Sequence, residues 1–324
     1  MKDSKTKQND IACRRGSVGG EAVIEGVMMK SRTHTALAVR APDGKIVTEV
    51  SECTSVKEKY PILKLPILRG VTNFVEQMAL SFRMLERSAE LAGEDGEEPD
   101  KLEKWLEEKL GKSAGAVASF VGAVLGVLLS VGLFIALPAF VSDLFEKYVC
   151  DVRIVKSIVD GVSKILIFIG YIALVTLMPD MKRVFMYHGA EHKTIFCYEA
   201  GLPLTVENIR KQVRFHPRCG TSFLFVMMFI GIIVSVLYVD LPLAVRVAVK
   251  LCVLPLVVGI GYEFIRYAGT HDNALVRVLS APGLWVQRLT TKEPDDSMIE
   301  VAAASLKAAL PEEFAKEETG GNDA

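Results

Sequence analysis

The stretch Ala114–Ser142, AGAVASFVGAVLGVLLSVGLFIALPAFVS, decides the fold class of this chain, because it runs without a single charged residue. About 20 apolar residues in a helix, at ~1.5 Å rise per residue, cross the roughly 30 Å hydrocarbon core of a bilayer. The stretch is therefore long enough to span a membrane. The chain as a whole is 50% hydrophobic, which is high for a soluble protein of this size and supports the same conclusion.

Three further stretches have the length and composition of membrane spans. Cys219–Val239 contains no charged residue, and Gly161–Pro179 contains only Lys164, near its edge, where a long side chain can reach the headgroups. Val245–Tyr267 is apolar in its middle and charged near its ends. We therefore expect an α-helical polytopic membrane protein with about four transmembrane helices. The charged residues of the fourth stretch are Arg246, Lys250, Glu263 and Arg266.

Lysine and arginine residues near the span ends predict the orientation, because cytoplasmic loops carry an excess of them. The loop between the second and third spans is rich in both, whereas acidic residues offset those of the loop between the first and second. We expect a multi-pass protein of the cell membrane, with both termini and the loop 180–218 in the cytoplasm. Six scattered cysteines without a CxxC pair fit free thiols in a reducing compartment. The basic residues of the loop are Lys182, Arg183, Lys193, Arg210, Lys211, Arg214 and Arg218.

Local patterns predict a small α+β domain before the first span. Thr35–Arg40 and Lys45–Val50 alternate as strands do around the turn Ala41–Gly44, and Gly70–Leu91 repeats its apolar residues at helical spacing. Tyr60–Leu68 holds two prolines and should be extended. The expected parts are a disordered tail 1–18, a cytoplasmic α+β domain 19–92, a linker and interfacial helix 93–113, a four-helix membrane domain 114–267, amphipathic C-terminal helices 268–310 and a disordered acidic tail 311–324.

Small residues recur every four positions in the first span, at Ala118, Gly122, Gly126 and Ser130. Small side chains on one face let another helix approach closely. We expect this face to pack inside the bundle. A seam between two copies of the chain, or with a membrane-protein partner, is the alternative.

The chemistry of the chain is concentrated in His188–His192, HGAEH, because three of the five histidines lie in the loop 180–218. If 180–200 is one helix, His188 and His192 share a face, where two imidazoles can ligate one zinc ion. Glu191 lies one residue off that line, near enough to act on a water molecule, and we assign it as the catalytic residue. The order H-x-x-E-H is that of inverzincin metallopeptidases.

A catalytic zinc needs a third protein ligand and an open position for water. Glu199 returns to the face of His192 after seven residues, and Glu263 is a more distant candidate. His216 and Cys219 lie three apart beside the third span. A set of three histidines and the cysteine would be closed and structural, whereas two histidines with a glutamate would be open and catalytic.

The segment Gly19–Lys30 is apolar and carries two carboxylates, Glu21 and Glu25. It could fold over the histidine loop and donate a ligand. Its structural alternative is a solvated or helix-capping pair of glutamates. For Glu263 the alternative is an interfacial position near a membrane end.

Each element of the histidine loop also has a purely structural interpretation. His188, Glu191 and His192 could form a hydrogen-bonded polar cluster that anchors the loop against the sheet, or act in acid–base chemistry without a metal. His216–Cys219 could be a capped turn in which Arg218 reaches lipid phosphates. The basic residues most simply meet the lipid bilayer. No nucleic-acid partner is expected, because basic and aromatic residues are not interleaved.

Five blocks of the sequence together resemble the YqhQ-like family of bacterial membrane proteins. The resemblance runs from about Gly19 to Trp285. It implies a metal-dependent enzyme, but it carries over neither a substrate nor a catalytic residue. The blocks are Gly20–Met29, Arg69-Gly70, Tyr187–Thr194, Leu204–Asn208 and His216–Phe223.

Two functions follow from different classes of protein. The first is a metal-dependent membrane enzyme, most plausibly a hydrolase, in which His188 and His192 bind a divalent metal, zinc by preference. The second is a non-catalytic accessory or scaffold factor that docks on a membrane complex, such as protein-insertion or envelope-assembly machinery. The small-residue face of the first span and the amphipathic flanks favour the second function.

Overall fold

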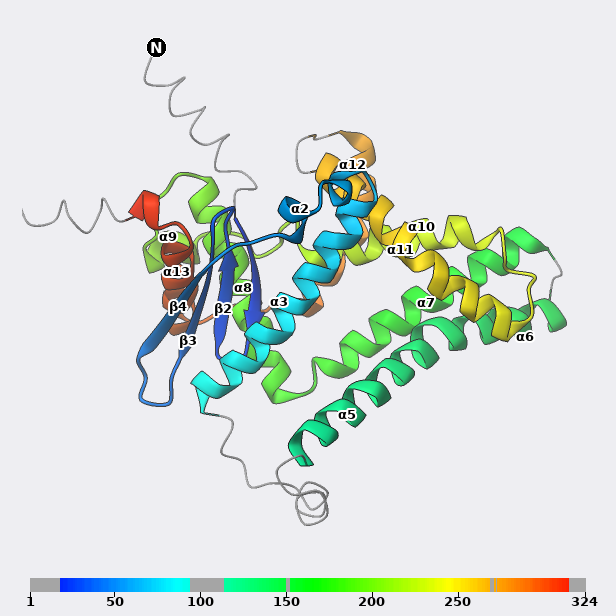
Figure 1. The fold of residues 1–324 in the computed structure, drawn as a ribbon, viewed down its shortest axis with the longest axis horizontal. Coiled ribbons are helices and arrows are strands. Elements are labelled where there is room, and N and C mark those ends of the chain that lie inside the picture. The colour runs from blue at the N-terminus through cyan, green and yellow to red at the C-terminus, as the bar shows by residue number, and fades with distance from the viewer. Residues whose placement is uncertain (1–17, 94–113, 150–151, 269–270, 272, 315–324) are drawn as a thin grey trace, which may run out of the picture. The chain divides into compact units, whose positions relative to one another are not determined.

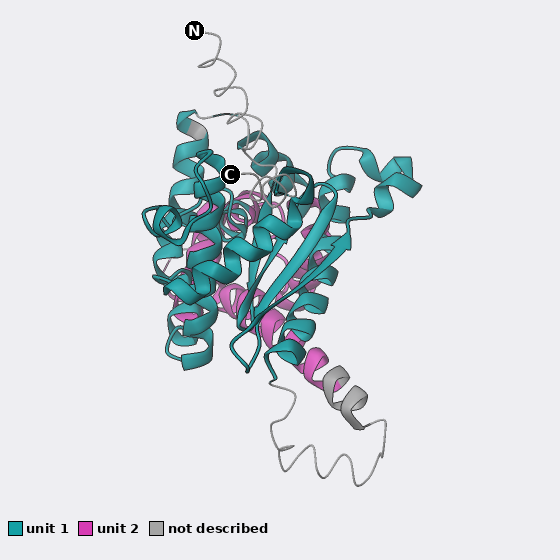
Figure 2. Cartoon of the chain, turned by 90° about the vertical axis from the view of Figure 1, so that its left-hand side faces the viewer, with its two compact units in different colours: residues 1–94, 172–226, 258–324 teal, residues 95–171, 227–257 magenta. Residues whose placement is uncertain are grey.

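The structure, a computed structural model, describes residues 18–93, 114–149, 152–268, 271 and 273–314. Most of the predicted tail 1–18, the predicted linker and interfacial helix 93–113 and the last ten residues of the acidic tail lie outside these ranges. The chain forms two compact units, coloured separately in Figure 2. Unit 1 comprises residues 1–94, 172–226 and 258–324, and unit 2 comprises residues 95–171 and 227–257.

Unit 1 is built on a four-stranded antiparallel sheet in the order β1-β2-β3-β4. Val23 pairs with Gly26 around a two-residue turn, in which Glu25 takes a left-handed φ of 48°. The β3–β4 hairpin turns at Gly44, whose φ is 85°, as the predicted turn requires. The two predicted strands, β3 and β4, are confirmed. The hairpin of β1 and β2, which was not predicted, precedes them. The strands are β1 (Gly19–Val23), β2 (Gly26–Lys30), β3 (His34–Arg40) and β4 (Ile46–Glu52).

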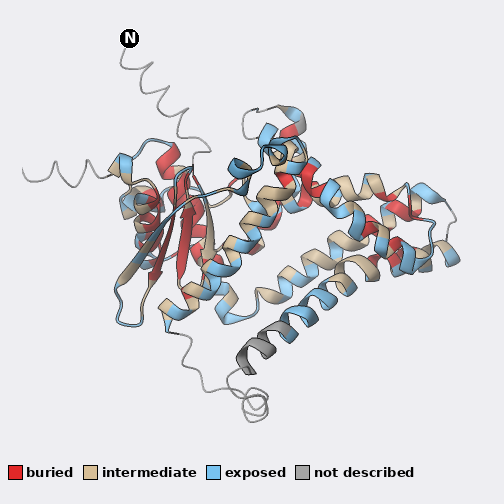
Figure 3. Cartoon of the chain, in the orientation of Figure 1, coloured by how far each residue is buried: buried red, intermediate tan, exposed pale blue. Residues whose placement is uncertain are grey.

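Helices cover both faces of this sheet (Figure 1). Helix α3 (Leu68–Ala92) packs on one face, over Met28 and Leu37. Helices α8 (Pro179–Glu199) and α13 (Asp296–Ala309) pack on the other, over the alternate residues of the same strands. Because side chains alternate along a strand, β2 and β3 are apolar in their middle, where they are buried on both sides, as Figure 3 shows.

Helix α13 lies in the predicted C-terminal helical region 268–310. Its buried face forms part of the larger core of unit 1. Small residues such as Ala302 allow close packing on the sheet, and the Ser305 hydroxyl donates to the Ala36 carbonyl at 3.0 Å. Residues 311–314, predicted as disordered tail, form a helical turn whose Phe314 packs on the same core.

Shorter elements complete unit 1. Tyr60–Leu68 was predicted to be extended, which is wrong for η1 (Pro61–Lys64), a 3₁₀ turn. Only Tyr60 and Leu65, the residues before the two prolines, are extended, because the proline ring restricts only its neighbour. The remaining elements are α2 (Val56–Lys59), α9 (Val206–Arg210) and α12 (Ala274–Thr290).

The described residues contain three helices long and apolar enough to cross a membrane: Val121–Tyr148, Arg153–Val175 and Leu243–Ala268. The first comprises α5 (Ala114–Val131), the π-helical segment η4 (Gly132–Ala136) and α6 (Leu137–Tyr148), and the others are α7 and α11. The predicted span 161–179 therefore begins eight residues earlier and ends before Pro179, which opens α8.

The predicted span 219–239 is the shortest of the four. Helix α10 (Gly220–Ser235) is apolar, but its 16 residues rise only about 24 Å, less than a typical hydrocarbon core. Residues after Ser235 turn instead of continuing the helix. The structure thus has three full-length candidate spans and one shorter apolar helix where four spans were expected.

Unit 2 holds buried charges among its helices. Arg246 is fully buried and donates to both carboxylate oxygens of Asp143, at 2.9 and 2.6 Å. Lys250 donates to Asp160 at 2.6 Å, and both side chains are buried. Among the described residues, none packs on the small-residue face of α5 at Gly122 or Gly126, where an added Cβ would meet nothing within 4 Å. The described part of the chain therefore does not provide the predicted packing of this face inside the bundle at these two positions.

Candidate metal centre

Helix α8 places the histidine motif in the interior of unit 1. The predicted helix over 180–200 is confirmed, and Pro179 occupies its first turn, where its missing N–H costs no hydrogen bond. The second half of the helix packs against β1, β2 and α13, as the predicted packing of the loop on the sheet requires. From Gly189 to Thr194 every residue of the helix is buried.

Gly189 allows another part of the chain to approach α8 closely. A Cβ at this position would overlap the carbonyl oxygen of Lys292, in the segment that follows α12. Glycine weakens a helix interior by ~1 kcal/mol relative to alanine. The close approach explains why a glycine occupies the middle of the motif despite this cost.

Both histidines of the motif are oriented by backbone carbonyls. His188 Nδ1 lies 2.8 Å from the carbonyl oxygen of Thr290, and His192 Nδ1 lies 2.5 Å from that of Arg214. A carbonyl oxygen only accepts, so each Nδ1 carries the proton in these hydrogen bonds. The neutral form of each ring then presents the lone pair of Nε2, the tautomer in which a histidine binds a metal through this atom.

Cys219 completes a group of three ligand atoms. Its Sγ lies 3.3 Å from His188 Nε2, and it accepts a hydrogen bond from the Thr221 hydroxyl at 3.4 Å. The ligand atoms of His188, His192 and Cys219 all lie within 4.8 Å of one another. Of the predicted third ligands, Cys219 is therefore the one that the structure brings to the two histidines.

The electrostatics shift Cys219 toward the thiolate and His192 toward the neutral imidazole. Burial acts to raise the pKa of Cys219, but hydrogen bonds and the charge of His192, together with Thr221, outweigh it and lower that pKa. Burial lowers the pKa of His192, as does the neighbouring charge of His188. These are the protonation states in which cysteine and histidine bind metals.

Glu191 lies beside the three ligand atoms and is almost fully buried. Its Oε2 is 3.9 Å from His188 Nε2, and its side chain packs against Gly20 of β1, where a Cβ would lie 2.7 Å from Glu191 Cγ. Burial raises the pKa of Glu191 to about 8, with smaller contributions from Cys219 and Glu21. A cation between the three ligand atoms would favour its charged form instead.

Glu199 and His216 lie near the cluster but form a separate polar pair. Their side chains approach to 3.8 Å, between Glu199 Oε2 and His216 Nε2, and Arg218 donates to Glu199. The backbone of His216 exchanges two hydrogen bonds with the side chain of Gln287, at 2.7 and 2.8 Å. Neither residue belongs to the group of mutually close ligand atoms found among the described residues.

The three remaining candidate glutamates have other partners. Glu21 accepts hydrogen bonds from Ser81 and, at 3.3 Å, from Gln77. Glu25 accepts from Nε and Nη2 of the Arg183 side chain and from the Tyr187 hydroxyl. Glu263 pairs with Arg69 through two hydrogen bonds, one of them 2.6 Å from Nε. The segment Gly19–Lys30 does fold against the histidine helix, but both of its carboxylates are engaged elsewhere.

The donor set fits a zinc ion. Two imidazole nitrogens and a thiol sulfur are ordinary zinc ligands. Ligand atoms at 2.0–2.3 Å in a tetrahedron lie roughly 3.3–3.8 Å apart, so separations within 4.8 Å need to contract by about 1.5 Å at most. Three protein ligands leave a fourth position, and the carboxylate of Glu191 lies beside the group, 3.9 Å from His188 Nε2.

Comparison with known proteins places the chain in a family. Residues 65–312 match the family described as "Protein of unknown function (DUF1385)". The chain belongs to this family. It is 37% identical over 293 residues to "Uncharacterized protein YqhQ" of Bacillus subtilis (strain 168), covering 90% of this chain and 92% of the relative. The resemblance to the YqhQ-like family is thus confirmed. No solved structure matches the chain.

Several residues that shape the site could not be found from the sequence. The carbonyls of Thr290 and Arg214 orient the histidines, but a backbone carbonyl is present at every position and gives no signal. Gln287, which holds His216, lies 71 residues away in the chain. Gly189 did give a signal, because a glycine inside a predicted helix often marks a close approach.

Proposed function

We propose that this protein is a membrane-bound, metal-dependent enzyme whose metal centre consists of His188, His192 and Cys219. The observation that carries the proposal is the convergence of these three ligand atoms, with Nδ1 of each histidine held by a carbonyl. Such outer hydrogen bonds fix the orientation of metal-ligating histidines. A divalent metal, zinc by preference, would supply Lewis acidity at this point.

Hydrolysis is the reaction class that suits the neighbouring carboxylate. Glu191 lies at the edge of the three-ligand group, where it can accept a proton from a water molecule and return it to a leaving group. In this scheme the oxygen of water forms the new bond to the substrate, and the bond to the leaving group breaks. Helix α8 and Gly20 hold the carboxylate in place and limit its contact with bulk water.

The proposed location is the cell membrane, with both termini and the metal centre in the cytoplasm. Three helices with the length and composition of membrane spans support the membrane assignment. The excess of lysine and arginine in the loop 180–218 supports the orientation. In the cytoplasm, where thiols stay reduced, Cys219 remains available as a ligand.

Metal analysis of the purified full-length protein tests the metal centre. We expect about one zinc per chain in the wild type, and loss of the metal in His192→Ala and Cys219→Ser. Cys252→Ser is the matched control, because Cys252 is a free, exposed cysteine. A wild type without a stoichiometric divalent metal, or a Cys219→Ser variant that keeps its zinc, contradicts the proposal.

Glu191→Gln separates a catalytic from a structural metal. In the catalytic case the variant keeps its zinc and fold but loses zinc-dependent cleavage of a probe such as p-nitrophenyl acetate by roughly 10²-fold or more. In the structural case the wild type cleaves no faster than its metal-free form. This second result rejects esterase-type hydrolysis while leaving the metal centre itself established by the previous experiment.

The second candidate is a non-catalytic accessory factor that docks on a membrane complex. The open face at Gly122 and Gly126 of α5 supports it, because small residues without neighbours leave room for a helix from another chain. Mild-detergent purification with Gly126→Leu tests this candidate. Loss of a co-purifying membrane protein in this variant, but not in Cys219→Ser, favours the accessory function over the enzyme.

A further inference from the structure

Helix α3 has an apolar surface on each of two sides. Its inner side, with Leu80 and Met84, packs on the sheet. Its outer side carries apolar residues at helical spacing that remain exposed. These outer residues and their exposed fractions are Val75 60%, Met78 42%, Phe82 68% and Leu85 43%. A contiguous exposed apolar stripe of this kind marks a surface that another apolar phase covers.

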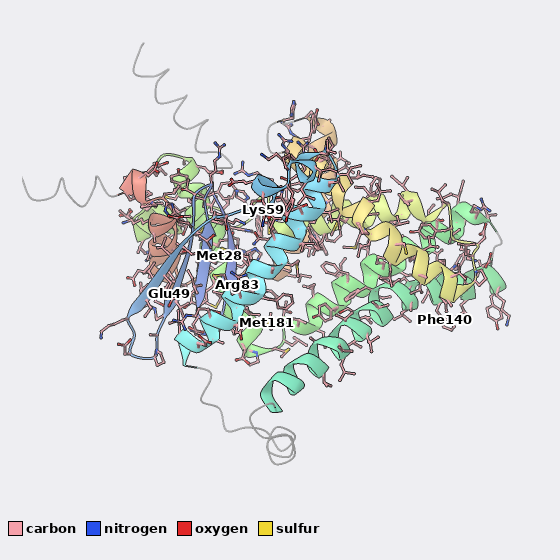
Figure 4. The ribbon with its side chains drawn as sticks, viewed as in Figure 1. Met28, Glu49, Lys59, Arg83, Phe140 and Met181 are labelled. Atoms are coloured by element: carbon pink, nitrogen blue, oxygen red, sulfur yellow. The ribbon has the colours of Figure 1, made fainter. Side chains whose placement is uncertain are left out.

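The segment before α3 continues this surface. Ile62, Leu65 and Leu68, in η1 and at the start of α3, are 64%, 52% and 42% exposed. Tyr60 precedes them and is half exposed. Lys59 and Lys64 are exposed and adjoin these apolar residues in the sequence, whereas Lys57 donates to the Asn73 side chain. Figure 4 shows Lys59 beside the start of α3 and Arg83 farther along it. Apolar and aromatic side chains bordered by lysines are typical of elements that lie in a membrane interface.

The start of α3 is fixed to α11, one of the candidate spans. A Cβ on Gly259 would overlap Ile67, and a Cβ on Gly70 would lie 2.8 Å from Tyr262 Cβ. Ile67 adopts a left-handed φ of 69°, which a β-branched residue takes only where the surroundings enforce it. The pair of Arg69 with Glu263 adds a third tie.

The position of these contacts along α11 places the exposed stripe of α3 at the bilayer. Helix α11 has 26 residues, and at 1.5 Å per residue it is about 39 Å long, some 9 Å longer than the hydrocarbon core. Gly259 lies about 13 Å before the helix end at Ala268. A centred span therefore puts Gly259, and with it Ile67, inside the hydrocarbon boundary.

We infer that the segment Val56–Leu85 is embedded in the lipid leaflet next to the end of α11. The outer stripe of α3 contacts acyl chains, and the exposed Lys59 and Lys64 face the phosphates of anionic headgroups. This inference goes beyond the proposed enzyme and does not depend on a metal. It makes the sheet of unit 1 a domain that is held flat against lipid by α3, in place of a freely exposed cytoplasmic domain.

Tryptophan fluorescence tests the inference on the full chain. The two native tryptophans, Trp105 and Trp285, are replaced by phenylalanine, and Phe82→Trp is introduced as the only tryptophan. The protein is reconstituted in nanodiscs of phosphatidylcholine and phosphatidylglycerol with brominated acyl chains. We expect about twofold quenching relative to unbrominated lipid, with blue-shifted emission, because bromine quenches only by contact in the acyl region. Met78→Trp is the second reporter if Phe82→Trp does not fold.

Val50→Trp on β4 is the matched control, since Val50 is an exposed apolar residue of the same unit, outside the segment. It should show solvent-like emission and no quenching. If Phe82→Trp is unquenched with solvent-like emission, the stripe faces water. If it is unquenched but blue-shifted, protein covers the stripe. Either result overturns the inference, as does equal quenching of Val50→Trp.

Discussion

Cys219 Sγ lies 3.3 Å from His188 Nε2, although the two residues are 31 positions apart. His188 lies within α8 and is held by the Thr290 carbonyl, and Cys219 directly precedes α10, so the contact joins three parts of unit 1. A metal bound here would therefore tie α8, the α12 end and α10 together. Metal binding at this site should affect folding as well as chemistry, because a ligand that binds only the native state stabilises that state.

Removal of zinc should thus lower thermal stability. Adding a strong chelator to the wild type should lower the midpoint of thermal unfolding, and zinc should restore it, because binding stabilises the native state in proportion to RT ln(1 + [L]/Kd). In Cys219→Ser the chelator should have no further effect. A wild type whose unfolding is indifferent to chelator and zinc would argue against a metal tie between these segments.

Gly189→Ala should destabilise the protein although alanine favours helices. The gain in helix propensity is ~1 kcal/mol, but the new methyl group would overlap the Lys292 carbonyl and push the following segment away. Overpacking of this kind costs typically 1–3 kcal/mol, so we expect a net loss of about 1 kcal/mol or more. Gly122→Ala is the control, since its Cβ would meet no neighbour. Unfolding in detergent, followed by circular dichroism, measures both variants.

The same variant should also affect the metal centre. Thr290, whose carbonyl orients His188, lies two residues before Lys292. Displacement of this segment weakens the outer hydrogen bond, and loss of such a bond typically costs 10–100-fold in metal affinity. Zinc competition with a chromogenic chelator gives the affinity. An unchanged affinity in a destabilised Gly189→Ala protein would mean that the Thr290 carbonyl is not needed to hold the metal.

Much of the local structure follows from the sequence, because hydrophobic period and turn residues are local signals. The β3–β4 hairpin, the α3 helix and the helix over 180–200 were predicted for this reason. The spacing of His188 and His192 likewise placed them on one helical face. Cys219 was one of four candidates for the third ligand, with Glu199, His216 and Glu263, and only the fold separates it from Glu199 and His216.

What the sequence could not predict depends on contacts between distant segments. Alanine-rich α13 looks like a surface helix by composition, yet its small side chains are what allow it to lie in the core on the sheet. Arg69 and Glu263 pair across 194 positions, and no local pattern links them. The predicted span 219–239 was longer than α10, because residues 236–239 are apolar but form a turn. An apolar composition does not show where a helix ends.

Arg218→Ala should expose the dependence of Glu199 on its partner. Arg218 donates to the buried carboxylate of Glu199, and His216 is within 3.8 Å of it. Loss of one partner of a buried ion pair costs about 3–5 kcal/mol, because the remaining charge stays desolvated. Glu199→Gln combined with Arg218→Ala should recover part of this loss. Chemical unfolding of the two single variants and the double variant measures the coupling.

The same series tests whether Glu199 is a metal ligand. With Cys219 in that role, zinc content in Glu199→Gln should match the wild type under conditions in which both are folded. Loss of zinc from folded Glu199→Gln would instead place this glutamate in the metal set. Arg218→Lys is the conservative control, since it keeps the charge without the planar guanidinium.

Asp295 predicts a pH dependence of folding. Partial burial acts to raise its pKa, but hydrogen bonds from the Ser297 hydroxyl at 2.6 Å and from the Met298 amide at 3.0 Å outweigh burial, and the net pKa is lowered. A carboxylate with a lowered pKa in the native state stabilises it above the ordinary value of about 3.9. That stability is lost as the pH falls through the lower native pKa.

Asp295→Asn should therefore resemble the wild type at pH 7 and lose less stability between about pH 5 and pH 3, because asparagine also caps helices but does not titrate. Asp295→Ala should lose about 1 kcal/mol at every pH, as the cap of α13 is removed. Unfolding midpoints across this pH range distinguish the variants. If the stability of Asp295→Asn falls as steeply with decreasing pH as that of the wild type, other carboxylates cause the acid sensitivity.

Lys250 and Asp160 form a buried ion pair between α11 and α7 within unit 2. Lys250→Met leaves the Asp160 carboxylate desolvated and unpaired, which should cost about 3–5 kcal/mol or abolish folding in detergent. The double variant Lys250→Met with Asp160→Leu removes both charges and should fold again, because apolar residues can replace a buried ion pair at little cost. Yield of monodisperse protein in detergent measures the rescue. If Lys250→Met is as stable as the double variant and the wild type, the pair is neutral in the native state. Its charges then contribute nothing to the packing of these two helices.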